Sequence, residues 1–279
     1  MSGTVYFNAD DFGWADGQNL AVERAHREGV LNRASILTNG LAFDQAAEIA
    51  HRLPGLAVGV HLTLNEGTPL LPRGKLEHLV APDGEFWLTP ADLLRVWISG
   101  RLTAESVLPE WRAQLERALS AGIKVSHLDS HKHVHMIPPL LDAIILLSKE
   151  YKIGYIRLPL ENIFLAPQRP PSIALWVFAC RARRYLVGAG LRFAERFIGF
   201  GASGKMTLDR LERAVSRMGG RSLEIMMHPA VLSPSVQELV RRYPGLAGYQ
   251  FEQELEALIG LKTRLFWGGD KNANEGPID

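Results

Sequence analysis

Strand-like and helix-like segments alternate along almost the whole chain, and this alternation limits the possible folds more than any other feature. Runs rich in β-branched and aromatic residues predict strands at residues 4–10, 34–40, 56–64, 124–129, 154–159, 222–229 and 263–269. Apolar residues at helical spacing predict helices at residues 17–29, 43–53, 103–121, 138–150, 172–190, 207–218 and 250–260. This order predicts a mainly parallel sheet with helices outside it, either closed into a barrel or open and doubly wound.

Residues 65–102 interrupt the alternation. Proline and glycine punctuate this stretch, and we interpret it as a long excursion that contains one short helix. A chain of 279 residues, 47% of them hydrophobic, is long enough for one large domain or two small ones. We expect a single domain over residues 1–269 and a flexible tail over residues 270–279.

The composition argues against several classes of protein. The 31 basic residues nearly balance the 30 acidic ones, which argues against a general nucleic-acid binder. Cys180 is the only cysteine, so no internal disulfide can form, which suits a reducing compartment. The first residues lack the pattern of a signal peptide. No apolar run reaches the roughly 20 residues that a membrane span needs. We therefore expect a cytoplasmic protein without a membrane span.

One segment qualifies this expectation. Residues 172–190 combine a short apolar run with Arg181, Arg183 and Arg184. A helix of this kind can lie on a membrane surface or hold a lipid-linked substrate. A helix with one buried face is the simpler interpretation, and we favour it.

Titratable residues follow the predicted strands at five separate places. In chain order these are Asp10 with Asp11, His61, the stretch HLDSHKHVH at 127–135, His228 and Asp270. The carboxyl ends of parallel strands meet at one edge of a sheet or barrel, where such folds place their active sites. We therefore expect these side chains to line a catalytic pocket.

The stretch HLDSHKHVH carries four histidines in nine residues. Alternate side chains of an extended segment share a face. That face would carry His127, Asp129, His131, His133 and His135. The strand should end near residue 129 or 130, so only some of these side chains can converge. A lone histidine would indicate a core or surface residue, but imidazoles clustered with carboxylates suit a divalent metal ion.

Asp10 and Asp11 are adjacent carboxylates, which repel each other unless a cation lies beside them. We expect one of them to bind the metal ion and the other to remain free to move protons. The alternative is that the pair only caps the turn or helix that follows. Arg157, in the stretch YIRLP, either clamps an anionic substrate or pairs with a carboxylate at the rim, and we favour the pairing.

The motifs NADDFG at the N-terminus, GVHLTL at 59–64 and HLDSHKHVH at 127–135 resemble those of the YdjC-like carbohydrate deacetylases, also called the ChbG/HpnK family. The stretches ASILTNG, SGKMT and EIMMHPA extend the resemblance over essentially the whole chain. It implies a TIM-barrel-like (β/α) barrel of up to seven strands, related to the polysaccharide deacetylases. It also implies a divalent metal ion and hydrolysis of an N-acetyl group from an amino sugar, which releases acetate.

Carried over motif by motif, the resemblance implies that Asp11, His61 and His131 bind the metal ion. It also implies that Asp10 is the general base and that His228 is a candidate general acid. The residues expected to support these groups or to contact substrate are His127, Asp129, His133 and Arg157, while His135 receives no role. The resemblance implies Mg²⁺, whereas two imidazoles and a carboxylate suit Zn²⁺ or another transition metal.

The resemblance leaves the substrate open between an N-acetylglucosamine-type oligosaccharide and a lipid-linked glycoside. SGKMT and the arginine-rich helix before it are closer to the hopanoid-associated branch of the family, whereas DSHKHVH is closer to the chitooligosaccharide branch. A metal-dependent hydrolase of another amide or ester, phosphoesters included, is the main alternative. A carbohydrate-binding protein without activity would have lost a base or a ligand, yet all four candidates are present. A homo-oligomer would fit the resemblance.

Overall fold

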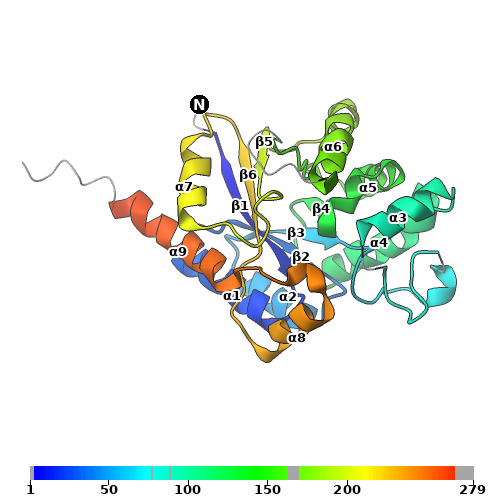
Figure 1. The fold of residues 1–279 in the computed structure, drawn as a ribbon, viewed down its shortest axis with the longest axis horizontal. Coiled ribbons are helices and arrows are strands. Elements are labelled where there is room, and N and C mark those ends of the chain that lie inside the picture. Colours follow the sequence, from blue (N-terminus) through cyan, green and yellow to red (C-terminus); the bar gives the residue numbers. More distant parts are fainter. Residues whose placement is uncertain (1–2, 77, 88, 163–169, 268–279) are drawn as a thin grey trace, which may run out of the picture.

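The structure is a computed structural model that describes residues 3–76, 78–87, 89–162 and 170–267. Six strands of these residues form one parallel sheet at the centre of the molecule, in the order β4-β3-β2-β1-β6-β5 (Figure 1). The strands are β1 (Val5–Phe12), β2 (Arg33–Ile36), β3 (Ala57–Leu62), β4 (Leu128–Ser130), β5 (Arg196–Ile198) and β6 (Leu223–Met227). The predicted α/β class with a parallel sheet is therefore confirmed. The described residues do not form a complete seven-stranded barrel.

The seventh strand, predicted at residues 154–159, is reduced to single-residue pairings. Ile156 pairs with Leu128 of β4, and the residue before it pairs with Arg192, both in parallel orientation. Pro159 has no backbone N–H, so it cannot continue a ladder of sheet hydrogen bonds. The segment lies beside β4, where a seventh strand would stand, but does not extend into one.

The strand predicted at residues 263–269 is wrong in its described part, because residues 263–267 continue α9 (Phe251–Trp267). Leu255, Leu258 and Leu261 recur at helical spacing and are buried, and the helix runs on past them. Residues 268–279, which include Asp270 and the predicted tail, lie outside the described residues.

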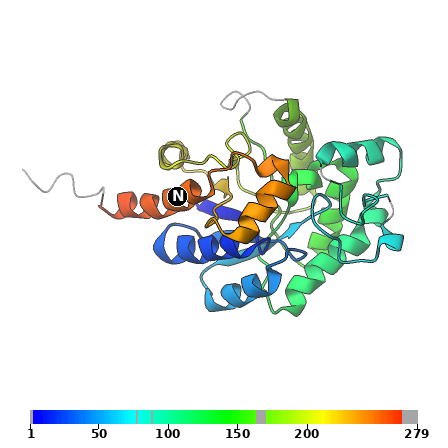
Figure 2. The ribbon, with the colours of Figure 1, turned by 60° about the horizontal axis from the view of Figure 1, so that its bottom comes forward.

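Helices surround the sheet, and in both views α7 and α9 lie at one end of the molecule and α3, α4 and α5 at the other (Figures 1 and 2). Before α9, the helices are α1 (Asp16–Glu28), α2 (Phe43–Arg52), α3 (Pro90–Ile98), α4 (Ala104–Ser120), α5 (Pro138–Glu150), α6 (Pro170–Gly188), α7 (Leu208–Ser216) and α8 (Pro234–Arg242). The short strand β5 and the helix α8 were not predicted. No helix in the described part of the chain is both long and apolar enough to cross a membrane.

The excursion at residues 65–102 is present between β3 and α4, and it contains the short helix α3 as predicted, together with the 3₁₀ turn η1 (Arg73–Lys75). Trp97 of α3 contacts Phe178 of α6 edge-on, with the ring centroids 6.1 Å apart. This contact brings the excursion and α6 together, although more than 70 residues separate them in the sequence.

The two faces of the sheet differ in polarity. On one face, alternate residues of β1 such as Phe7 join the apolar core beneath the helices. On the other face, Asn8 of the same strand donates a hydrogen bond to Asp10. Gly59 of β3 leaves room on this face for the His127 ring, because a Cβ atom at residue 59 would lie 2.4 Å from that ring. The interior of the curved sheet is therefore polar, and it leads to the carboxyl ends of the strands.

Candidate active site and metal centre

A backbone irregularity places Asp10 and Asp11 in one pocket. In a regular strand, neighbouring side chains point to opposite faces. Here the pairing of β1 with β2 shifts register between Ala9 and Phe12, and Asp11 has a left-handed φ of 63°. This conformation costs a non-glycine residue on the order of 1–3 kcal/mol and is typical of functional sites. Both carboxylates consequently line the same cavity at the end of the central strand.

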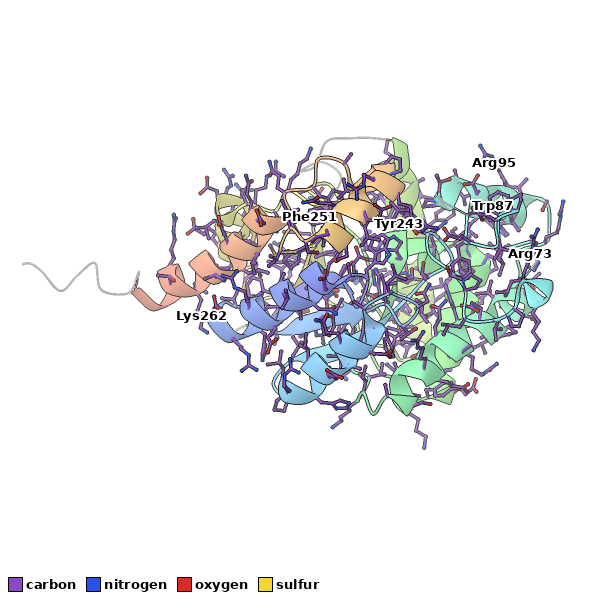
Figure 3. All side chains as sticks on the ribbon, turned by 90° about the horizontal axis from the view of Figure 1, so that it is seen from below. Arg73, Trp87, Arg95, Tyr243, Phe251 and Lys262 are labelled. Atoms are coloured by element: carbon purple, nitrogen blue, oxygen red, sulfur yellow. The ribbon has the colours of Figure 1, made fainter. Side chains whose placement is uncertain are left out.

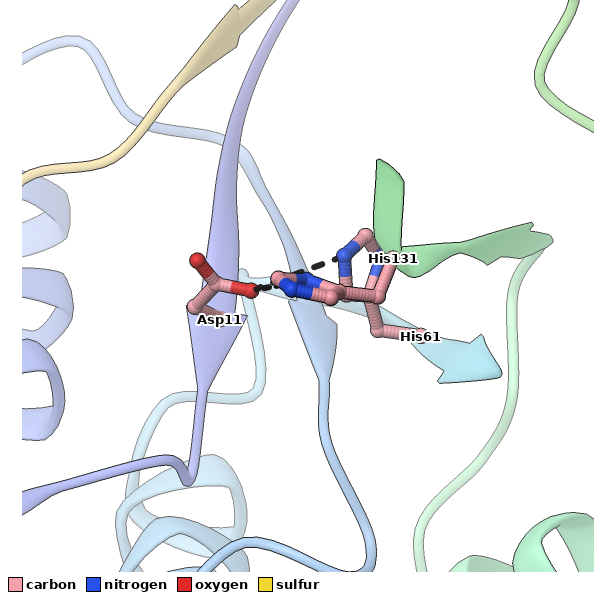
Figure 4. A group of neighbouring side chains, drawn as sticks. All are labelled: Asp11, His61 and His131. Carbon is pink, nitrogen blue, oxygen red and sulfur yellow. Dashed lines mark hydrogen bonds and ion pairs between the residues drawn. The ribbon is translucent and has the colours of Figure 1, made fainter. Parts of the chain in front are cut away.

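Asp11, His61 and His131 form a three-residue group whose candidate ligand atoms all lie within 4.8 Å of one another (Figure 4). The Asp11 Oδ1 atom is 3.0 Å from His131 Nδ1 and 3.6 Å from His61 Nε2. The three side chains come from the ends of β1 and β3 and from the turn after β4, and all three are buried. One carboxylate oxygen and two imidazole nitrogens form a donor set that suits a divalent metal ion.

Each histidine of this group also contacts a carboxylate with its other ring nitrogen. His61 Nδ1 is 2.7 Å from Asp129 Oδ1, because these two residues are direct partners in the pairing of β3 with β4. His131 Nε2 is 2.9 Å from Glu66 Oε2. A carboxylate that contacts one ring nitrogen of a histidine keeps the proton on that nitrogen. The other ring nitrogen is then free to bind a metal ion.

The charges of the site also fit a cation. Burial alone would lower the pKa of His131, but the Asp11 and Glu66 carboxylates outweigh burial and raise it to about 9. For Asp11 the signs are reversed. Burial alone would raise its pKa, but the facing histidines outweigh burial and hold this pKa far below its ordinary value. The carboxylates of the pocket thus stabilise a positive charge, even on the buried imidazole of His131. The residues that are present therefore fit a divalent metal ion.

Arg157 is fully buried and pairs with carboxylates on three strands, in agreement with the favoured interpretation. Its Nη1 lies 2.7 Å from Asp10 Oδ2 and 2.8 Å from Asp129 Oδ2, and its Nε lies 2.6 Å from Glu224 Oε1. These carboxylates outweigh the burial of Arg157 and raise its pKa well above the ordinary value. The arginine therefore connects Asp10 with the carboxylate that contacts His61.

The expected shared face of the HLDSHKHVH stretch ends with β4. Residues 131–136 form a 3₁₀ turn in which Lys132 and His133 adopt left-handed φ values of 52° and 55°. The expectation that the strand ends near residue 129 or 130 is therefore confirmed, because β4 ends at Ser130 and two consecutive left-handed residues then rotate the chain. Only His131 of the turn joins the candidate metal centre.

The remaining histidines of the stretch have separate surroundings. His127 Nε2 lies 3.2 Å from Ser35 Oγ, and burial lowers the pKa of His127 to about 3. His135 contacts Ser130 Oγ at 2.5 Å with Nδ1 and the Arg157 carbonyl oxygen at 3.0 Å with Nε2. His133 lines the cavity, and its ring lies edge-on to the Phe197 ring, with the two ring centroids 5.5 Å apart. His127 and His135 therefore act within the framework around the site, whereas His133 reaches the cavity wall.

His228 follows β6 and lines the cavity, with 9% of the residue exposed. Its backbone N–H donates to Glu254 Oε2 at 2.5 Å, and its ring packs against Tyr249 at 5.2 Å. Among the described residues, no group forms a hydrogen bond with the buried Nδ1 atom of His228. Burial lowers the pKa of His228, although the nearby Asp11 and Asp10 carboxylates oppose this effect.

The cavity has a volume of about 780 Å³ and two different regions. At its base lie the carboxylates and histidines described above. Its walls are largely apolar, with Leu94 from α3, Leu175 and Phe178 from α6, and Met226 from β6. The site therefore combines a polar centre with an apolar approach.

Several residues around the site escaped the sequence analysis. Glu66 is the most important, since it contacts a candidate ligand and has a left-handed φ of 61°. Its position a few residues after β3, beside Gly67, was the available signal, because the rule that groups residues near strand ends applies to it as it does to His61. Glu224, which pairs with Arg157, lies inside β6. Glu254 accepts a hydrogen bond from the His228 backbone and lies in α9. Neither position gave a comparable signal in the sequence.

The family model described as YdjC-like protein matches residues 4–267 of this chain. A carbohydrate deacetylase of Halalkalibacterium halodurans is 33% identical, over 91% of this chain and 94% of the relative. A chitooligosaccharide deacetylase of Klebsiella pneumoniae is also 33% identical, over 88% of this chain and 89% of the relative. The crystal structure of an Enterococcus faecalis protein with a proposed role in cellobiose-phosphate cleavage superimposes with a TM-score of 0.74, at 26% identity and 96% coverage of both chains. This chain belongs to the YdjC-like family.

Proposed function

We propose that this protein is a divalent-metal-dependent carbohydrate deacetylase, which hydrolyses the N-acetyl group of an amino sugar and releases acetate. The convergence of Asp11 Oδ1, His61 Nε2 and His131 Nδ1 beside a second carboxylate, that of Asp10, carries this proposal. The deacetylase names of the relatives support the same reaction class.

Asp11, His61 and His131 would hold the metal ion. When bound, a divalent ion polarises the acetyl carbonyl and activates water for attack on it. The two imidazole donors favour Zn²⁺ or another transition metal, whereas the resemblance to the family implies Mg²⁺. Metal analysis of the purified protein decides between them.

Asp10 is our candidate for the general base. Two hydrogen bonds from Arg157 and one from Asn8 fix its carboxylate, and its Oδ2 atom lies 3.9 Å from His61 Nε2. This places a proton acceptor at the edge of the candidate metal centre, where the attacking water must lose a proton. These donors hold the Asp10 carboxylate in a fixed orientation beside the candidate metal centre.

His228 is our candidate for the general acid, since an amide nitrogen leaves poorly until it is protonated. It lines the same cavity as Asp10 and Asp11 from the neighbouring strand β6. Because burial lowers the pKa of His228, the protonated ring gives up its proton more readily than an ordinary imidazolium does. The assignment therefore predicts that activity decreases as the pH rises above this lowered pKa.

The apolar walls favour a substrate that carries an apolar group beside its sugar. Leu94, Leu175 and Phe178 line the approach, and a free oligosaccharide would need hydrogen-bond partners there. On the outer surface of α6, Val177 is 53% exposed and Arg181 is exposed. These features support a lipid-linked N-acetylglucosaminyl substrate over a chitooligosaccharide.

Acetate release from a panel of substrates tests this function. The panel contains N-acetylglucosamine, its short β-1,4 oligomers and an N-acetylglucosaminyl lipid, each offered to metal-stripped and metal-restored protein. We expect metal-dependent release, strongest with the lipid. Phosphate release from phosphoesters, with no acetate from any sugar, would instead support the alternative hydrolase. Sedimentation with liposomes would show whether α6 also contacts a lipid surface.

A further inference from the structure

Glu66 stands in the turn that follows β3, outside the groups assigned above. Its side chain is only 5% exposed, and its two oxygens have different partners. Oε2 lies 2.9 Å from His131 Nε2, and Oε1 lies 2.5 Å from Lys132 Nζ. The carboxylate thus contacts two consecutive residues of the turn that follows β4.

The backbone around Glu66 is held in place by contacts from distant parts of the chain. The Glu66 N–H donates to the Trp87 carbonyl at 3.2 Å, and Asn65 Nδ2 donates to the same oxygen at 3.1 Å. The Gly67 N–H donates to Tyr243 Oη at 3.1 Å, and Figure 3 labels both Trp87 and Tyr243. These bonds support the left-handed φ of 61° at Glu66, which would otherwise be unfavourable. The position of this carboxylate is therefore specified by the fold.

The contact between Glu66 and His131 matches the contact between Asp129 and His61. In each pair a buried carboxylate binds the ring nitrogen on the side away from Asp11, at 2.9 and 2.7 Å respectively. In each pair the other ring nitrogen faces Asp11 Oδ1. The two histidines thus have equivalent supports, one from the sheet and one from the excursion.

We propose that Glu66 is a positioning residue that presents His131 Nδ1 to the metal ion, while Lys132 holds the second oxygen of Glu66. This inference rests on the proposed metal centre. It also assigns a task to the excursion at residues 65–102, whose first turn supplies the support for one of the three ligands. Glu66 itself is not the ligand, because its Oε2 atom contacts His131 Nε2, the ring nitrogen that points away from Asp11.

Metal affinity of the full-length protein tests this inference. Metal-stripped wild type, Glu66→Gln and Asp129→Asn are titrated with Co²⁺ and Zn²⁺ against a competing chelator. We expect both variants to lose about 10- to 100-fold in affinity, which is typical when the carboxylate behind a metal-binding histidine is removed. Their Co²⁺ absorption spectra should keep the intensity of the wild type, because the three ligands remain.

Glu85→Gln is the matched control. Glu85 lies in the same excursion and pairs with Arg242 of α8, but it contacts no histidine among the described residues. Its metal affinity should equal that of the wild type. Glu66→Asp keeps the charge but is too short to reach His131 Nε2, so it should also lose affinity, and it serves as the second variant if Glu66→Gln folds poorly.

Three results would overturn the inference. Wild-type affinity in Glu66→Gln or in Glu66→Asp would show that Glu66 does not position His131. A Co²⁺ spectrum in Glu66→Gln that indicates a lost donor would show that Glu66 is itself a ligand. If the wild type binds neither ion, the proposed metal centre fails as well, so failure of the proposed function is distinguishable from failure of the role of Glu66 alone.

Discussion

Arg157 donates two hydrogen bonds to Asp10, Nη1 to Oδ2 and Nη2 to Oδ1, each 2.7 Å long. The arginine side chain is completely buried and that of the aspartate is 2% exposed. A two-point contact between planar groups fixes orientation as well as distance. The residue that we propose as the base is therefore held rigidly, and its position depends on a side chain from the segment that replaces a seventh strand.

Replacement of Arg157 should be costly. Arg157→Met leaves Asp10, Asp129 and Glu224 without their shared cation, so the free energy of unfolding should fall by about 3–5 kcal/mol. Urea unfolding measures this change. Arg241→Met is the matched control, because Arg241 lies 2.6 Å from Glu238 but both side chains are about two-thirds exposed. The free energy of unfolding of this control variant should fall by less than about 1 kcal/mol. Equal losses in the two variants would contradict the importance of the buried pairing.

Glu254 should make stability depend on pH. Burial raises its pKa from the ordinary 4.5 to about 7, even though the His228 and Met206 backbone N–H groups stabilise the carboxylate. Between these two values the unfolded chain loses the proton and the folded chain keeps it. Stability therefore falls as the pH rises from 4.5 to 7, by on the order of 3 kcal/mol from this group.

Unfolding measured across this range for wild type and Glu254→Gln checks the effect. The glutamine cannot titrate, so the stability of the variant relative to the wild type should increase with pH. A constant difference between the two proteins from pH 4.5 to 7 would contradict the raised pKa of Glu254.

Metal binding should compete with a proton on His131. The pKa of His131 is about 9 without metal, because Asp11 and Glu66 outweigh its burial, and the Nδ1 proton must leave when an ion binds. Apparent metal affinity should therefore rise by up to about tenfold per pH unit between pH 6.5 and 8.5. Calorimetry in buffers of different ionisation enthalpy measures the released protons. An affinity that is independent of pH in this range, with no proton release, would contradict the arrangement.

The apolar approach should discriminate between substrates. Leu175→Gln places an amide in the wall of the cavity, so the KM for an N-acetylglucosaminyl lipid should rise about tenfold. The KM for a free chitooligosaccharide should change little. Leu146→Gln, on the 49% exposed outer side of α5, is the control and should affect neither substrate. An equal change for both substrates would contradict a role in binding the apolar group.

The positions of strand ends grouped Asp11 and His61 with the HLDSHKHVH stretch, the family resemblance singled out His131 within that stretch, and the structure brings the three residues together. Strand ends in a parallel sheet meet at one edge whatever the details of packing, so residues that follow strands could be grouped without coordinates. The bulge that turns both aspartates into one pocket was not predictable, because it depends on the register between β1 and β2.

Features that depend on distant contacts were missed. Glu66 reaches His131 only because Trp87 and Tyr243 hold its turn, and neither contact is visible in local sequence. The end of β4 near residue 130 was predicted, but the left-handed pair Lys132 and His133 in the turn after it was not. These deviations lie at the candidate site, where tertiary contacts outweigh local preference.

The most direct test of the account compares Asp10→Asn and His131→Ala with the wild type, by acetate release and by bound metal in the same samples. Asp10→Asn should bind metal as the wild type does and lose at least about 100-fold in kcat, because the proton acceptor is gone. His131→Ala should lose most bound metal and, with it, the activity. Wild-type turnover in both variants, or acetate release from protein shown to hold no metal ion, would contradict the proposed deacetylase site.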